Sequence, residues 1–308
     1  MPSFLQAFAV PEIAYSVIDK IVLPQEQRVI ESLNTGVFSG HDLPDGFALA
    51  AYKRGIFSLC EDDFANEKTP FAHNRYKLSN FYGRLDVFVI SEPETYRSFS
   101  AETRKALDNW YFDAYYQQLS LPQDEVITQE EAFARIDNDE RQIYLAPCDC
   151  RSLSGDCGKA LETCLSWRSG INTFAGRGLS KPISKEQAKQ VVVEAEKSGL
   201  MHTTNPNTIC NCCGDCCYLM RAQKRMRAEK RNKSWLKSNH VISYNEGLCS
   251  KCGKCVSRCN LSVFAAEKES GKNRIKNISV NIDECAGCGI CVSTCHSGAL
   301  TLKTCCVQ

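Results

Sequence analysis

The chain has 308 residues, a length that favours two domains over one, and its 37 Lys and Arg nearly balance 36 Asp and Glu. The net charge of +1 gives no overall field that would steer the chain to nucleic acid or to an anionic membrane. A hydrophobic content of 43% with 24% charged residues is typical of a globular protein and excludes a collagen-like or disordered chain. The unusual feature is the 20 cysteines, about one residue in fifteen.

The cysteines are expected to bind metal rather than to form disulfides. The first 20 residues lack the basic start and the long apolar run of a secretory signal, and no stretch approaches 18 uncharged apolar residues. We therefore expect a cytoplasmic protein without a membrane span, and in that compartment thiols stay reduced. The distribution agrees, since Cys60 is the only cysteine before residue 148 and nineteen follow it. Cys60, Cys305 and Cys306 are expected to remain free thiols.

Residues 1–92 are predicted to form a small module of helices and strands. Amphipathic helical patterns and then strand patterns occur in the order 11–21, 24–33 and 43–54, then 56–59 and 85–90. Three helices followed by two strands resemble the winged helix, a fold that often binds DNA. A reading helix would expose basic and polar residues, whereas residues 43–54 are mostly apolar with Asp45 early. We expect this module to pack against a partner or the rest of the chain, and DNA binding is not expected.

Residues 93–145 are predicted to be a helical connector. A helix is expected over residues 98–119, with Ser100 as its N-cap and aromatic side chains along one face. That face either packs in the core or docks a redox partner. An acidic run follows, because residues 121–140 hold seven acidic side chains and Arg135 is their only basic residue.

Residues 146–220 form a predicted helical, cysteine-rich middle region with nine thiols. These are Cys148, Cys150, Cys157, Cys164, Cys210, Cys212, Cys213, Cys216 and Cys217. A helix between the two groups is expected, because Ser184 and Gln187 have the form of a capping box and Gly199 can end it. Four ligands per cluster allow one or two additional iron–sulfur clusters here, while Cys213-x2-Cys216 is also a fair half-site for zinc.

The nine thiols together with the motifs that follow them look like a loosely characterised family of Cys-rich iron–sulfur proteins of anaerobes. The resemblance rests on Pro147-Cys-Asp-Cys-Arg151, two spaced cysteines and the Cys210-Asn-Cys-Cys213 string. It implies an oxygen-sensitive iron–sulfur protein.

A basic linker is expected over residues 221–240, which hold eight basic side chains. That linker is solvated, neutralises the charge of the reduced clusters or docks an acidic partner, and it could also pair with the acidic run.

Residues 241–308 contain the strongest pattern in the sequence. Cys249, Cys252, Cys255 and Cys259 have the spacing C-x2-C-x2-C-x3-C, and the same spacing returns 36 residues later at Cys285, Cys288, Cys291 and Cys295. A four-point repeat indicates an internal duplication. Three thiolates, each separated from the next by two residues on a tight loop, can hold three corners of an iron–sulfur cube. Zinc prefers two separated C-x2-C knuckles.

The repeat resembles the bacterial two-cluster ferredoxins. The resemblance implies two 4Fe–4S clusters with crossed ligation, in which the fourth cysteine of each motif binds the other cluster. The first cluster is then bound by Cys249, Cys252, Cys255 and Cys295, and the second by Cys285, Cys288, Cys291 and Cys259. The family's proline after each fourth cysteine is replaced by Asn260 and His296.

The alternation of residues agrees with a βαββαβ ferredoxin-like domain. Strands are predicted over residues 240–244, 262–266, 275–280 and 299–302, with a polar surface hairpin over 267–274. The overall prediction is therefore an α+β protein.

The predicted function is one-electron transfer between a low-potential donor and a partner oxidoreductase, as a carrier or an electron-transfer subunit. No residue is assigned as general acid, base or nucleophile, so whether the chain is itself an enzyme stays open. Two alternatives are a reductase with chemistry at an unusual upstream cluster and a redox-sensing regulator that uses residues 1–92.

Overall fold

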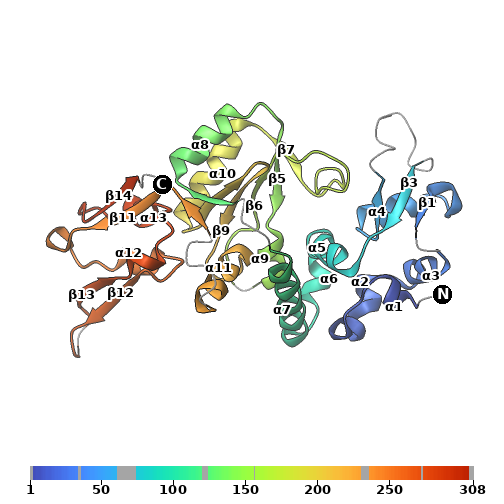
Figure 1. Ribbon diagram of the computed structural model, residues 1–308, viewed down its shortest axis with the longest axis horizontal. Helices are drawn as coiled ribbons and strands as arrows, with labels where there is room; N and C mark the ends of the chain where they lie inside the picture. Colours follow the sequence, from blue (N-terminus) through green and yellow to red (C-terminus); the bar gives the residue numbers. More distant parts are fainter. Residues whose placement is uncertain are drawn as a thin grey trace. The chain divides into compact units, whose positions relative to one another are not determined.

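The computed structural model describes residues 3–33, 36–60, 74–119, 124–155, 157–229, 236–271 and 273–304. The chain forms two compact units, each built from separate segments (Figure 1). The first unit comprises residues 1–118, 146–155 and 168–182, and the second comprises residues 119–145, 156–167 and 183–308. No helix in the described ranges combines the length and the apolar character needed to cross a bilayer.

The first unit is mainly helical with one small sheet. Its helices are α1 (Phe4–Ala7), α2 (Ile18–Ile21), α3 (Pro24–Ser32), α4 (Phe47–Lys53), α5 (Phe81–Ser91), α6 (Pro93–Arg97), α7 (Ala101–Gln118) and α9 (Asp149–Ser154), with 3-10 turns η1 (Glu12–Val17) and η2 (Gly40–Asp42). Strands β1 (Val37–Ser39), β2 (Phe57–Leu59) and β3 (Arg75–Leu78) form an antiparallel sheet in the order β1-β3-β2. The predicted helices over residues 24–33 and 98–119 are confirmed as α3 and α7, whereas residues 11–21 are only a 3-10 turn followed by the short α2.

The strand predicted over residues 85–90 is wrong, because these residues lie in α5. Asn80 caps this helix by accepting a hydrogen bond from the Gly83 amide at 2.9 Å. Leu85, Phe88 and most of their neighbours are buried, and a helix that is apolar on every side shows no 3.6-residue period. The strand partner of β2 is instead β3.

A buried cation organises the first unit. Arg84 has no exposed side-chain surface, and its guanidinium lies 2.6 Å from the Glu92 carboxylate and donates to the carbonyl oxygens of Ile21 and Arg54. Arg54 in turn pairs with Glu92 at 2.6 Å and with Glu26 of α3 at 2.7 Å. Burial lowers the pKa of Arg84 to about 10. A buried charge persists only with such partners, so this network fixes α3, α5 and α6 together.

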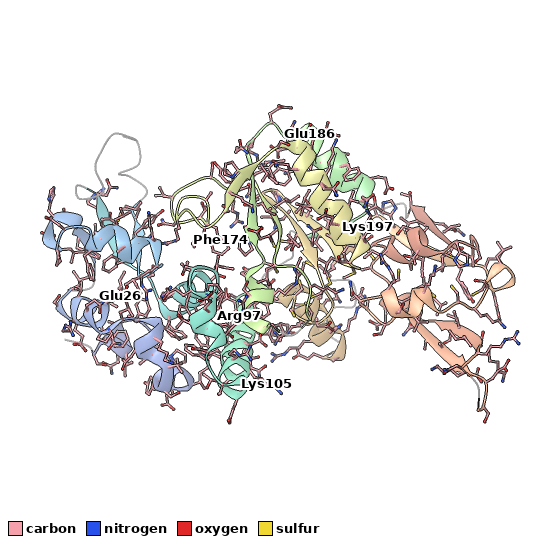
Figure 2. The ribbon with its side chains drawn as sticks, turned by 180° about the vertical axis from the view of Figure 1, so that it is seen from behind. Glu26, Arg97, Lys105, Phe174, Glu186 and Lys197 are labelled. Atoms are coloured by element: carbon pink, nitrogen blue, oxygen red, sulfur yellow. The ribbon has the colours of Figure 1, made fainter. Side chains whose placement is uncertain are left out.

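The second unit is built on a seven-stranded sheet in the order β10-β4-β8-β9-β6-β5-β7. The strands are β4 (Glu125–Ile127), β5 (Ile143–Pro147), β6 (Glu162–Ser166), β7 (Lys181–Ile183), β8 (Met201–Asn205), β9 (Thr208–Cys212) and β10 (Lys237–Ser238). Helices α8 (Gln129–Asn138) and α10 (Lys185–Lys197) lie side by side over one face (Figures 1 and 2). Their buried residues Ala132, Ile136, Ala188 and Val192 share a core with Leu165 and Ile209 of the sheet.

The sequence predicted that the middle region is helical. This prediction is wrong, because the region also contains strands β6 to β9. Its β8 and β9 form an antiparallel hairpin in which Thr203 pairs with Cys210 and Met201 with Cys212. β-Branched residues such as Thr203 and Ile209 favour strands. The expected helix between the cysteine groups is confirmed as α10. Its capping box is confirmed as well, since Ser184 accepts a hydrogen bond from the Gln187 amide at 3.2 Å.

The C-terminal part of the second unit has the order strand, helix, strand, strand, helix, strand (Figure 1). These are β11 (His240–Tyr244), α12 (Lys254–Arg258), β12 (Phe264–Lys268), β13 (Ile275–Val280), α13 (Ile290–Thr294) and β14 (Leu300–Thr304), preceded by α11 (Tyr218–Ala228). The four predicted strands are confirmed, and they form two separate antiparallel pairs, β11 with β14 and β12 with β13. The polar segment between β12 and β13 joins them as a hairpin, as predicted.

The acidic and basic runs meet over a limited stretch. β10 of the basic run pairs in parallel with β4 of the acidic run, and His240 Nε2 lies 2.9 Å from Glu131. Arg227, by contrast, forms an ion pair with Glu284, which belongs to neither run. The two runs thus meet at one edge of the sheet and at the contact between His240 and Glu131.

Candidate metal centres

The structure keeps the cysteines as thiols. None of the 18 cysteines in the described ranges forms a disulfide, and Cys60 is half-buried. Cys305 and Cys306 lie outside the described residues.

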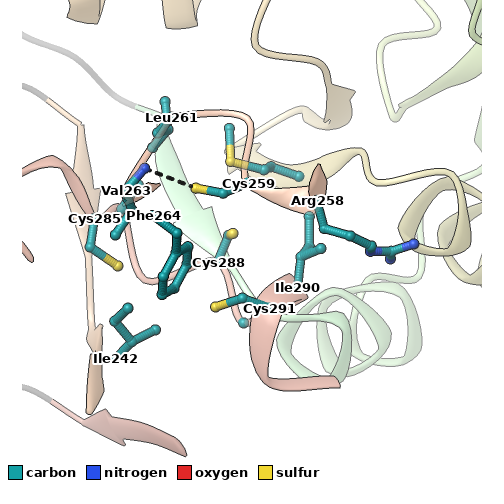
Figure 3. A pocket seen from close by; sticks show the side chains of 13 residues that line it. Ile242, Arg258, Cys259, Leu261, Val263, Phe264, Cys285, Cys288, Ile290 and Cys291 are labelled. Atoms are coloured by element: carbon teal, nitrogen blue, oxygen red, sulfur yellow. Dashed lines mark hydrogen bonds between the residues drawn. The ribbon is translucent and has the colours of Figure 1, made fainter. Parts of the chain in front are cut away.

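Four thiols of the duplicated motif line one hollow (Figure 3). They are Cys259 from the first motif and Cys285, Cys288 and Cys291 from the second. The hollow has about 340 Å³ free of protein atoms, including solvent at its mouth, and Phe264 contributes to its apolar wall. The crossed placement of Cys259 follows from α12, which ends at Arg258 and delivers the next residue to the loops of the second motif.

Backbone amides in this hollow are aimed at sulfur. The amide of Val263 donates to Cys259 Sγ at 3.4 Å, and the amide of Gly287 donates to Cys285 Sγ at 3.3 Å. Burial and neighbouring thiols raise the pKa of Cys288 to about 12 and that of Cys291 further above its ordinary value. A cationic group is therefore needed to hold these side chains as thiolates. Four sulfur donors, oriented amides and an apolar wall fit an iron–sulfur cluster.

The loop beside this hollow requires glycine at residue 287. Gly287 has a φ of +66°, and a Cβ there would overlap the backbone carbonyl of His240 and come 2.5 Å from Ser238 Oγ. The loop that carries Cys285 and Cys288 therefore lies directly against the start of β11, and a side chain would push it away.

Three thiols of the first motif gather at a more exposed place. Burial raises the pKa of Cys255 above its ordinary value, and the neighbouring thiols of Cys249 and Cys252 also raise it. Cys252 is exposed, and Cys249 accepts a hydrogen bond from the Lys251 amide at 3.4 Å. Cys295 follows α13, and its thiol lies 3.6 Å from Ser297 Oγ.

The nine upstream cysteines separate into three sets. Cys148 and Cys150 belong to the first unit, where their sulfurs and a carboxylate oxygen of Asp149 lie within 4.8 Å of one another. Burial raises the pKa of Asp86 well above its usual range, and the neighbouring Asp149 carboxylate also raises it. Tyr111 hydrogen-bonds to Asp86.

A second set lies on the sheet face opposite α8 and α10. Leu165 pairs with Ile209 in the β6–β9 ladder, and continuing this register sets Cys164 opposite Cys210. Cys212 follows Cys210 by two residues, so their side chains share a face. Cys217, at the start of α11, hydrogen-bonds to Cys212, and this bond together with burial raises the pKa of Cys212 well above its ordinary value.

A third set combines distant segments. The sulfurs of Cys157, Cys213 and Cys216 lie within 4.8 Å of one another. Cys213 and Cys216 are buried beside Ala195 and Leu200 of the α10 end. The Cys216 amide donates to Cys213 Sγ at 3.3 Å, and hydrogen bonds from Cys216 lower the pKa of Cys213 to about 4 despite burial.

The turn between Cys213 and Cys216 touches the duplicated motif. A Cβ on Gly214 would overlap the carbonyl oxygen of Asn260 and come 3.0 Å from its carbonyl carbon. The Asn260 amide donates to the Gly199 carbonyl at 2.6 Å. Arg258 donates to the carbonyls of Glu196 and Lys197 at 2.6 and 2.7 Å.

Sequence reasoning missed this contact. Asn260 stood out as a departure from the expected proline, and its side chain has a partner at Gly199. Met201, which lines the hollow of Cys259, was also missed, since an apolar strand residue has no motif that marks it.

Comparison with known protein families matches residues 248–299 to the 4Fe-4S dicluster domain. Neither a curated protein nor a solved structure matches the chain significantly. The match covers both copies of the repeat, so the C-terminal part of the chain carries a 4Fe-4S dicluster domain, while residues 1–247 are outside it.

Proposed function

We propose that this protein transfers single electrons between a low-potential donor and a partner oxidoreductase, as a carrier or as an electron-transfer subunit. The observation that carries the proposal is the set of eight thiols in two matching loops, one of which delivers its last cysteine to the other. When bound to such thiols, 4Fe–4S clusters supply one-electron redox chemistry.

The proposed ligand sets are crossed. Cys285, Cys288, Cys291 and Cys259 hold the second cluster, and their common hollow supports this set. Cys249, Cys252, Cys255 and Cys295 hold the first, and the proximity of the first three supports it.

We further propose that Cys164, Cys210, Cys212 and Cys217 hold one additional iron–sulfur cluster. Three thiols on one sheet face, with Cys217 hydrogen-bonded to Cys212 from the start of α11, meet the ligand number of a 4Fe–4S cluster. Of the other five upstream thiols, Cys157, Cys213 and Cys216 form a set of their own, and Cys148 and Cys150 lie in the first unit.

The partner is proposed to dock near Cys252. This cysteine is exposed and is flanked by the exposed Lys251 and Lys254, whereas Cys291 of the second set is buried. Exposed lysines around a redox centre favour an acidic partner surface. Lys251→Glu with Lys254→Glu should slow reduction by an acidic electron donor at least tenfold at low salt. The exposed control Lys276→Glu on β13 should have little effect, and equal slowing by both variants would contradict this docking site.

Iron and acid-labile sulfide analysis under anaerobic conditions, with EPR of the reduced protein, tests the ligand sets. Cys259→Ser and Cys288→Ser should alter the same EPR signal, and Cys295→Ser and Cys252→Ser should alter the other. Each variant should lose up to four irons, counting four per cluster. If Cys259→Ser altered the signal that Cys252→Ser alters, the crossed sets would be wrong. Unchanged iron in all four variants would refute the proposed function.

The first unit is proposed to contain a winged-helix-like module over residues 1–92 that serves protein contacts. The strand order β1-β3-β2 and the helix α4 directly before β2 support this topology. We also propose that the protein works in the cytoplasm of an anaerobe, as its thiol-rich composition suggests.

A further inference from the structure

One set of thiols has a geometry unlike that of the two ferredoxin-type sets. The sulfurs of Cys157, Cys213 and Cys216 all lie within 4.8 Å of one another. Two sulfurs on one tetrahedral zinc, at about 2.3 Å from the metal, lie about 3.8 Å apart. A cube of four irons and four sulfides separates its cysteine sulfurs more widely, because each binds a different iron. The compact spacing therefore suits a single ion.

The local backbone also has the form of a metal knuckle. Cys213 and Cys216 are separated by two residues on a tight turn, and the Cys216 amide donates to Cys213 Sγ at 3.3 Å. The third thiol comes from the segment before β6, 56 residues earlier in the chain. A dithiol that works by forming a disulfide needs no third cysteine, whereas three cysteines with one further ligand are a common donor set of structural zinc sites.

The surroundings require a positive charge if these thiols ionise. Cys213 and Cys216 are each 1% exposed, and Cys157 packs against the same cluster with Ala195 and Leu200. Several thiolates in an apolar environment are costly unless a cation compensates them.

We propose that Cys157, Cys213 and Cys216 bind one zinc ion, separate from every iron–sulfur cluster, with the fourth position taken by a ligand other than cysteine. The ion joins the loop of Cys157 to the turn that carries Gly214. That turn is in contact with Asn260, next to Cys259. The zinc site is thus the support on which the dicluster domain rests, and it takes no part in electron transfer.

The test uses the full chain, purified anaerobically after growth with added zinc, and measures zinc, iron and sulfide per chain. Wild type should contain about one zinc with three sulfur neighbours near 2.3 Å by zinc X-ray absorption. Cys157→Ser and Cys216→Ser should each lose at least 80% of the zinc and keep iron and sulfide. Cys60→Ser is the matched control, and it should keep all three.

Three results would overturn the proposal. They are a wild-type protein without zinc, a loss of iron together with sulfide in Cys157→Ser, and a Cys213–Cys216 disulfide in peptide maps of the anaerobically alkylated protein. The absorption measurement on wild type does not depend on whether a variant folds. Loss of the proposed electron-transfer function appears instead in the iron of Cys259→Ser and Cys252→Ser, so the two failures are distinguishable.

Discussion

Gly214→Ala should loosen the dicluster domain from the sheet without touching any cysteine. The added methyl carbon would come 3.0 Å from the carbonyl carbon of Asn260 and closer to its oxygen. Carbon atoms prefer separations of about 3.5–4.0 Å, so the two backbones must move apart by about 0.5–1 Å. This movement stretches the hydrogen bond from Asn260 to Gly199 and those made by Arg258. Overpacking of this kind costs about 1–3 kcal/mol.

The assay is anaerobic denaturant unfolding of the iron-loaded protein, followed by the visible absorption of its clusters. A loss of about 1–3 kcal/mol corresponds to a change of about 5- to 150-fold in the unfolding constant. Gly170→Ala is the control, because a methyl there meets nothing within 4 Å and the backbone is not in the left-handed region. If Gly214→Ala unfolded at the same denaturant concentration as wild type, the contact with Asn260 would not support the domain.

Three further substitutions test other parts of the structure. Gly287→Ala should remove about four irons per chain by iron analysis, because a methyl would overlap the His240 backbone where φ is +66°; full iron would contradict the close approach. Arg258→Ala, which removes two hydrogen bonds to α10, should cost about 1–3 kcal/mol in denaturant unfolding, whereas the exposed control Arg274→Ala should cost under about 0.5 kcal/mol. Arg84→Leu breaks a buried ion pair and should destabilise the first unit by about 3–5 kcal/mol; an unchanged thermal transition would show that the network is dispensable.

The C-terminal part of the structure follows closely from the sequence. The spacing of eight cysteines and the alternation around them predicted four strands, and β11 and β13 have the predicted bounds. Such local patterns suffice because each loop and strand is specified by its own residues.

Other parts depend on tertiary contacts that no local pattern contains. Residues 85–90 lie in a helix that is buried on most sides, and such burial removes the periodicity that distinguishes a helix from a strand. Likewise, Cys212 and Cys213 are neighbours in sequence but belong to different thiol sets. The strand β9 ends at Cys212, and the turn that follows directs Cys213 toward Cys157.

The 36-residue repeat is symmetric in its cysteines and asymmetric in its anchors. Arg258 and Asn260, which hold the end of α10, correspond in the second copy to Thr294 and the exposed His296. A chain with its two copies exchanged in order would keep all eight spacings, yet it would have Thr and His where Arg and Asn bind the carbonyls at the end of α10. The two halves of the repeat therefore share their cysteine spacing and differ in the residues that fix each half in its place.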